Sequence, residues 1–92
     1  MRLDLFLKAS RLIVRRSLAQ EFCDAGLVKI NDAAAKSSRE VKANDRIEIK
    51  RHNRLTQIMV LQVPDKKQVS KQDAANLYEI VSEKAIDDNL VN

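Results

Sequence analysis

The hydrophobic pattern of this chain changes its period at Gly26, the only glycine among its 92 residues. Before Gly26, apolar residues recur at the three- and four-residue spacing of amphipathic helices. After it, apolar and polar residues alternate, as they do in half-buried strands. Gly26 itself lies where a left-handed residue ends many helices, although it would equally well begin a loop. The change of period predicts an α+β domain in which helices precede a small antiparallel sheet.

Two short helices are predicted before the glycine. The first spans Leu3 to about Leu12, where a dense set of apolar residues follows the helical spacing. The second begins at Ser17 and ends near Ala25. Ser17 and Gln20 have the S-x-x-Q form of a capping box, in which two side chains bond the free amides of the first turn. Each helix is expected to bury one apolar face.

Short strands are predicted after the glycine, separated by polar turns. Two of them are Asn31-Asp32 and Asn44-Asp45, where Asn and Asp tolerate the positive φ that such turns require. His52-Asn53 breaks the alternating pattern before the last strand. The strands are expected over residues 28–30, 33–35, 47–49 and 55–63. These segments suffice for a small twisted antiparallel sheet on which the two helices pack.

The last part of the chain is expected to add a third helix. This helix is predicted from about Lys71 to Lys84, because apolar residues recur there at helical spacing. Its apolar positions are Ala74, Leu77, Tyr78 and Val81. The tail from Asp87 is expected to fray. We therefore expect a domain over residues 1–64, followed by a linker and C-terminal helix over 65–92 that pack on the domain or extend it.

Positive charge is concentrated in the first half of the chain, although the net charge is only +4. Residues 1–54 hold 13 Lys and Arg against 7 Asp and Glu, whereas residues 55–92 hold 4 against 6. This asymmetry favours a polyanion-binding surface in the first half, the alternative being an ordinary solvated surface. Phe6, Phe22 and Tyr78 are the only aromatic residues, which is few for a platform that stacks bases.

Arg15, Arg16 and Ser17 stand at the predicted start of the second helix. Arginine at this position opposes the positive end of the helix dipole, which costs roughly a few tenths of a kcal/mol unless an anion binds there. Free backbone amides and two guanidiniums together make a good phosphate site. The candidate contacts with nucleic acid are Arg2, Lys8, Arg11, Arg15, Arg16, Ser17, Lys29 and Lys36, and Arg39 belongs to the same basic half.

The groups needed for catalysis are mostly missing. His52 is the only histidine, so the usual His/Cys metal site cannot be assembled. A single glycine does not make a phosphate-cradling glycine loop. The lone Cys23 is expected to be a small core residue in a reducing compartment. A pair of catalytic carboxylates is the arrangement that the sequence leaves open. We therefore expect no enzyme, no metal and no cofactor.

No targeting or membrane segment is evident. The N-terminal apolar run is too short and too charged for a signal peptide, and no apolar span approaches transmembrane length. We expect a soluble cytoplasmic monomer without membrane contact.

Several short motifs together resemble the S-four RNA-binding domain, also called the alpha-L motif. They are Met1-Arg2-Leu3-Asp4-x-Phe6-Leu7, Arg15-Arg16-Ser17-x-Ala19, Gly26-x-Val28-x-Ile30-Asn31, Ala35-Lys36 and Val41-x-x-x-Asp45-x-Ile47-x-Ile49. The resemblance covers about residues 1–50 and implies two helices on a small antiparallel sheet. Two departures are the missing glycines after Asn31 and before Asp45, both within predicted turns.

The length and the Ala74-Ala75-Asn76-Leu77-Tyr78 segment resemble a bacterial group of stand-alone S-four domains related to the fifteen-kilodalton heat-shock protein. That resemblance implies a non-catalytic factor in ribosome-associated quality control. It would bind the ribosomal RNA of the large subunit and the peptidyl-tRNA that this subunit carries. A third partner would be a factor that adds alanine tails to stalled chains. Arg2 and Arg16 would contact RNA, with Lys8 and Arg15 nearby.

Other functions remain as alternatives at this point. A general binder of ribosomal or other structured RNA has the same basic surface. A DNA-binding helix-turn-helix module also has two short helices, although it usually dimerises over paired half-sites. A protein-interaction adaptor would use the predicted C-terminal helix with Leu77, Tyr78 and Val81.

Overall fold

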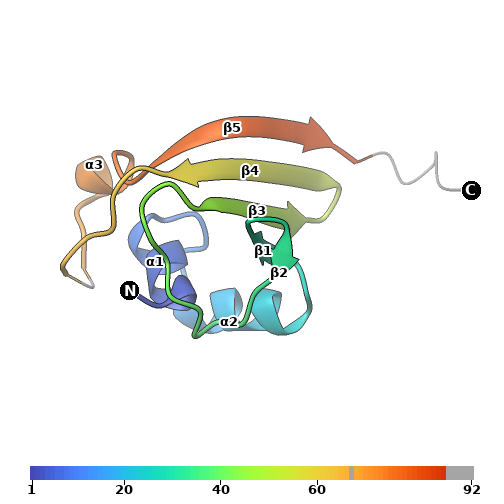
Figure 1. Cartoon of the computed structure of the whole chain (residues 1–92), viewed down its shortest axis with the longest axis horizontal. Coiled ribbons are helices and arrows are strands. Elements are labelled where there is room, and N and C mark those ends of the chain that lie inside the picture. Colours follow the sequence, from blue (N-terminus) through green and yellow to red (C-terminus); the bar gives the residue numbers. More distant parts are fainter. Residues whose placement is uncertain (67, 87–92) are drawn as a thin grey trace, which may run out of the picture.

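A computed structural model describes residues 1–66 and 68–86, which form two short helices on one face of a five-stranded antiparallel sheet (Figure 1). The order along the chain is α1 (Leu3–Ala9), α2 (Arg16–Asp24), β1 (Val28–Ile30), β2 (Ala33–Ala34), β3 (Arg46–Arg51), β4 (Arg54–Val60), α3 (Lys71–Ala74) and β5 (Tyr78–Ala85). The predicted α+β class, with two short helices on a small antiparallel sheet, is confirmed. None of the helices in these ranges has the length and apolarity to span a membrane.

The first helix is shorter than predicted, and the second begins differently. Helix α1 ends at Ala9 instead of Leu12, because Arg11 adopts a left-handed φ of 64° that stops the helix. The predicted capping box at Ser17 is wrong. Helix α2 already begins at Arg16, and the side chain of Gln20 donates to Asp4 instead of bonding a helix amide. A partner outside the helix therefore outweighs the local capping motif.

Gly26 and the two Asn-Asp turns adopt the conformations that the sequence predicts, whereas at His52-Asn53 the positive φ of 51° belongs to His52. Gly26 has a φ of 74° directly after α2, as expected for a left-handed helix end. Asn31 and Asp32 both have positive φ values, 50° and 72°, which is the requirement for a two-residue hairpin between β1 and β2. Asn44 has a φ of 75° in the turn before β3. Asn and Asp thus occupy the two turns in which the motif departs from glycine.

The sheet has the strand order β2-β1-β3-β4-β5, and every neighbouring pair is antiparallel. Strand β4 ends at Val60, three residues before the predicted end. The core between the helices and the sheet contains Leu3, Phe6, Leu7, Ala19 and Cys23 from the helices, and Val28, Ile30, Ile47, Ile49, Ile58 and Val60 from the strands. Alternate residues of each strand face away from the helices, and the described elements leave that outer face open (Figure 1).

The prediction of a helix over residues 71–84 is wrong for most of its length. Only Lys71–Ala74 is helical, and Tyr78–Ala85 forms β5, which pairs with β4. The segment after Leu77 contains β-branched residues, which favour strands. Without it, the outer edge of β4 would leave backbone N–H and C=O groups unpaired. Tertiary pairing therefore outweighs the helical spacing. The predicted frayed tail from Asp87 lies outside the described residues.

Candidate nucleic-acid interface

A fully buried carboxylate, Asp4, joins the starts of the two helices. Its Oδ1 accepts from Nε of Arg2 at 3.2 Å, and its Oδ2 accepts from Nε of Arg16 at 3.2 Å. Gln20 donates to the same Oδ2 at 2.8 Å, and the amide of Leu5 donates to Oδ1 at 2.8 Å. One carboxylate thus brings together two arginines that are 14 positions apart in the sequence. We call Arg2 and Arg16, held by Asp4, the arginine pair.

The two arginines bind Asp4 from the side of their Nε atoms, and their side chains stay 45% and 41% exposed. Nη2 of Arg2 also donates to Oδ2 of Asp4, at 3.4 Å. Guanidinium groups carry five N–H donors, so most donors of the arginine pair have no partner among the described residues and can bind another anion. Arginine grips phosphate through two parallel hydrogen bonds, provided that the guanidinium plane is oriented. Asp4 supplies that orientation before any ligand arrives.

The charge state of Asp4 results from two opposing effects. Burial alone raises the pKa of its carboxyl group, because the charged form loses water. Hydrogen bonds from Gln20 and Arg16, the positive charge of Arg16 and the Leu5 amide lower the pKa by more, so the net pKa lies below its ordinary value. Asp4 is therefore ionised at neutral pH and holds the arginines as a charged partner.

The start of α1 is fixed by the loop that follows β2. The amides of Leu3 and Asp4 donate to the carbonyls of Arg39 and Ser37, at 2.8 and 3.1 Å. The N-terminal ammonium pairs with Glu40, and the backbone of Arg2 forms an isolated antiparallel β-bridge with that of Glu40. These contacts fix the backbone on which Arg2 stands.

The start of α2 presents the predicted arginines, although it lacks the predicted capping box. Arg15 is the N-cap residue, and within the described chain its side chain makes no capping hydrogen bond. The first turn of α2 contains no acidic residue. Its first amides lack intrahelical partners, as at every helix start. Arg15 and Ser17 are exposed and Arg16 is half-buried, so amides and guanidiniums lie together at one surface.

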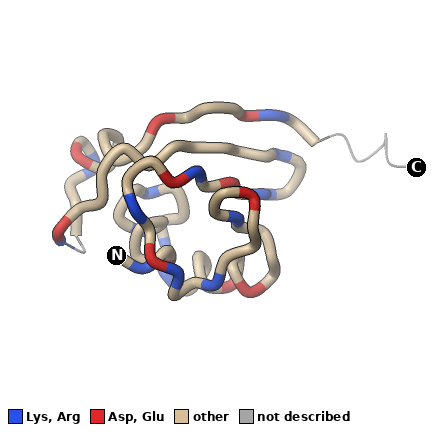
Figure 2. The backbone as a smooth tube through the Cα atoms, in the orientation of Figure 1, with Lys and Arg blue, Asp and Glu red and all other residues tan. Residues whose placement is uncertain are grey.

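The remaining predicted contacts are distributed over three places. Lys8 and Arg11 are exposed and line one shallow hollow at the end of α1, although Arg11 is no longer helical. Lys36 is exposed in the loop whose carbonyls bond the start of α1. Lys29 stands opposite Glu48 in the sheet and alternates with buried neighbours, so it lies on the outer face. Figure 2 shows that Lys and Arg positions occur in both layers of the fold.

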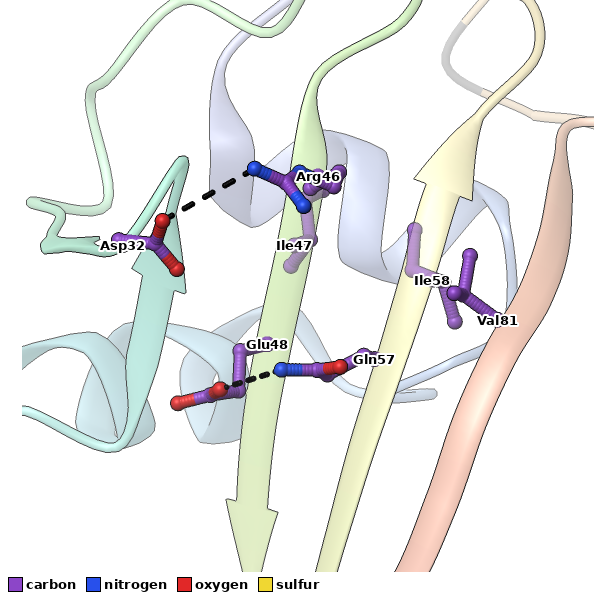
Figure 3. Close-up of a pocket in the computed structure, with 7 residues that line it drawn as sticks. All are labelled: Asp32, Arg46, Ile47, Glu48, Gln57, Ile58 and Val81. Atoms are coloured by element: carbon purple, nitrogen blue, oxygen red, sulfur yellow. Dashed lines mark hydrogen bonds and ion pairs between the residues drawn. The ribbon is translucent and has the colours of Figure 1, made fainter.

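A hollow on the outer face of the sheet has a different character (Figure 3). Its polar groups pair with one another. Nη2 of Arg46 lies 3.9 Å from Oδ2 of Asp32, and Nε2 of Gln57 donates to Oε1 of Glu48 at 2.9 Å. The apolar part includes Val81, which lies at the bulge where the β4–β5 register shifts. Because its charges pair internally, this hollow is a poor site for a polyanion.

Sequence reasoning missed the residues that position the arginine pair. Asp4 appeared only as part of a motif, and Gln20 was assigned to a capping box. The available signal was a lone carboxylate within the apolar run Leu3–Leu7, since a buried charge needs partners. The sequence indicated the arginines by their charge and position, without the group that fixes them.

Known proteins are similar to this chain over most of its length. The S4 domain family matches residues 1–47. The RQC P-site tRNA stabilizing factor of Streptococcus pneumoniae is 46% identical over 98% of this chain and all of its own length. The protein of the same name from Bacillus subtilis is 42% identical over 94% of this chain and 98% of its own length.

A solved structure shares the fold as well. The crystal structure of Heat Shock Protein 15 from Vibrio cholerae, described as trimeric, superposes with a TM-score of 0.80 at 28% identity. The match covers 89% of this chain and 82% of that chain. The chain therefore belongs to the S4-domain family and, within it, to the group of RQC P-site tRNA stabilizing factors.

Proposed function

We propose that this protein is a non-catalytic RNA-binding factor of ribosome-associated quality control. It binds the large ribosomal subunit that still carries peptidyl-tRNA and contacts both ribosomal RNA and tRNA. In this role it supports a partner factor that adds alanine tails to stalled chains, and it acts in the cytoplasm as a monomer. The names of its relatives support the tRNA and quality-control parts of this proposal.

The observation that carries the proposal is the arginine pair held by buried Asp4. The carboxylate fixes two guanidiniums at one surface beside the uncapped start of α2. Such a surface contacts phosphates at defined positions and does not distinguish one nucleotide sequence from another. We infer that Arg2 and Arg16 contact the RNA backbone directly, with Arg15 and Ser17 beside them. Lys8, Arg11, Lys29 and Lys36 lie elsewhere on the surface and add long-range attraction for RNA.

We also propose that residues 1–64 form the RNA-binding domain. Residues 65–86 then extend it by adding β5 to the sheet edge. In this arrangement the C-terminal part supports the domain instead of forming a detachable docking element.

Sedimentation in a sucrose gradient tests the proposed function. The full chain is mixed with large subunits that carry peptidyl-tRNA, and separately with empty large subunits. We expect co-sedimentation with the first and weaker association with the second, because the tRNA supplies part of the contact. A protein that stays at the top of both gradients contradicts the proposal. Excess duplex DNA in a parallel gradient separates general polyanion binding from RNA binding, since a DNA-binding module would be displaced.

A further inference from the structure

The helices cover only part of the sheet face on which they pack. Ile58 of β4 is buried beneath them, whereas its cross-strand neighbour Ile80 in β5 is 54% exposed. A groove lies between this uncovered part and the loop that joins α1 to α2. The residues that line it include Arg11, Arg51, Arg54, Tyr78, Ile80 and Glu83. We call this feature the arginine groove.

Like charges meet in the arginine groove. Arg51 and Arg54 stand directly opposite each other in the β3–β4 hairpin, and like charges at such a position destabilise a sheet. Arg11 adds a third cation from the α1–α2 loop. The one carboxylate among the described lining residues is Glu83, which lies 3.8 Å from Nη1 of Arg54. Three cations against one anion leave the groove positive.

One of these arginines is held in place by side-chain contacts, and another stands on an uncommon backbone conformation. Arg11 has a φ of 64°, which L-residues rarely adopt, and such conformations concentrate at binding sites. Nη2 of Arg51 donates to the carbonyl of Leu12 at 2.6 Å, and its guanidinium lies 5.7 Å from the centre of the Phe22 ring. The Leu12 contact also joins the hairpin to the α1–α2 loop, so both walls of the groove are connected.

The floor of the groove is apolar and aromatic. Tyr78 is half-buried and Ile80 is largely exposed, and both lie on the helix side of β5. Nucleic acid that is single-stranded uses this combination, because phosphates need cations and unpaired bases or sugars need an apolar or aromatic contact. A duplex keeps its bases inside and would not use the floor.

We propose that the arginine groove is a second RNA site that binds a single-stranded segment. Arg11 and Arg54 contact its phosphates, and Tyr78 with Ile80 contacts a base or sugar. Arg51 holds the groove in shape through Leu12. This proposal rests on the proposed function in one respect only, which is that RNA is the partner of this protein.

The test uses the full chain and a fluorescein-labelled hexauridylate. Arg11→Gln and Arg54→Gln are each expected to weaken its binding at low salt by about tenfold, because each removes a phosphate contact. Lys50→Gln is the matched control. Lys50 is exposed on the same hairpin, but it alternates with buried Ile49 and faces the other side of the sheet, so its variant should bind normally.

A second readout observes the groove directly. Tyr78 is the only tyrosine, so labelling with 3-fluorotyrosine gives one ¹⁹F signal. We expect hexauridylate to shift this signal in the wild type. The same shift is expected in Arg16→Gln, because Arg16 belongs to the arginine pair and not to the arginine groove.

Three results would overturn the proposal. The protein does not bind hexauridylate, or the ¹⁹F signal of Tyr78 does not move at saturation, or both groove variants bind hexauridylate as the wild type does. A hexaglutamate peptide that binds as tightly as RNA and depends on the same arginines would assign the groove to an acidic protein. If Arg16→Gln alone abolishes RNA binding, the proposed function stands and the second site is wrong.

Discussion

Nε of Arg16 lies 3.2 Å from Oδ2 of Asp4, a carboxylate without exposed surface that belongs to the other helix. The same carboxylate accepts from Nε of Arg2. A buried ion usually persists only where it is paired and fully hydrogen-bonded, and Asp4 meets both conditions. Two like-charged side chains are thereby held close together at the surface, in a geometry suited to a second, external anion.

Replacing Asp4 by Asn should destabilise the fold and flatten its response to acid. The pKa of Asp4 in the folded protein lies below its ordinary value of 3.8. Its contribution is therefore complete above about pH 4 and is lost as the pH falls through the lower, folded pKa. We expect Asp4→Asn to lower the free energy of unfolding by about 1–3 kcal/mol at pH 7. The difference from the wild type should shrink at low pH.

Urea unfolding between pH 2 and pH 7 measures this effect. Asp24→Asn is the matched control, because Asp24 ends α2 and is exposed, so the control should unfold like the wild type at pH 7. A constant difference between Asp4→Asn and the wild type over the whole range would contradict the assignment of a depressed pKa to Asp4.

Cys23 should resist thiol reagents while the protein is folded. Burial, followed by the charges of Asp4 and Asp24, raises the pKa of its thiol from 9.0 to about 11, so very little thiolate exists at pH 8. We expect 5,5′-dithiobis(2-nitrobenzoate) to react only as fast as the protein opens, and at once in guanidinium chloride. A thiol introduced by Ser38→Cys at the exposed loop is the control and should react immediately. Equal rates for the two thiols would show that Cys23 is accessible.

Gly26→Ala should destabilise the protein through its backbone alone. The φ of 74° is unfavourable for alanine, while no described atom lies within 4 Å of the position that the added methyl group would take, so no clash adds to the strain. We expect a loss of about 1 kcal/mol. Gly26→Asn should lose less, because Asn tolerates the left-handed region. Thermal unfolding of both variants checks this order, and an alanine variant as stable as the wild type would contradict it.

Leu77→Ala should show that the C-terminal segment belongs to the fold. Leu77 is buried, and its carbonyl accepts from the amide of Leu61 at the end of β4. We expect a loss of about 2–4 kcal/mol in denaturant unfolding. Val81→Ala, whose side chain is 55% exposed on β5, should change stability by less than about 1 kcal/mol. If both variants match the wild type, the segment is a detachable element and the adaptor hypothesis regains support.

The sequence predicts those parts of the fold that depend on local rules. The period change at Gly26 locates the helix-to-strand transition, and Asn31-Asp32 specifies the hairpin, because both depend on which residues accept a positive φ. The segment after Leu77 is mispredicted, since its apolar spacing fits a helix and a strand alike. The free edge of β4 decides between them, and that edge exists only once the sheet has formed.

The site was predictable in its charges and not in its organisation. Arg15, Arg16 and Ser17 are indicated by an unfavourable placement at a helix start, a signal that needs no tertiary information. The pairing of Arg16 with Arg2 depends on the crossing of α1 and α2, which brings Asp4 beside Gln20. Contacts between residues so far apart in the chain carry no periodic signal.

The central claim is that the arginine pair held by Asp4 contacts RNA phosphates. The most direct test is the salt dependence of binding to large subunits that carry peptidyl-tRNA, measured for the wild type, Arg2→Gln and Arg16→Gln. Each substitution should reduce the slope of log K against log[salt] by about one, because one phosphate contact is lost. Lys84→Gln, on exposed β5, should leave the slope unchanged. Slopes for Arg2→Gln and Arg16→Gln that equal that of the wild type would contradict the account.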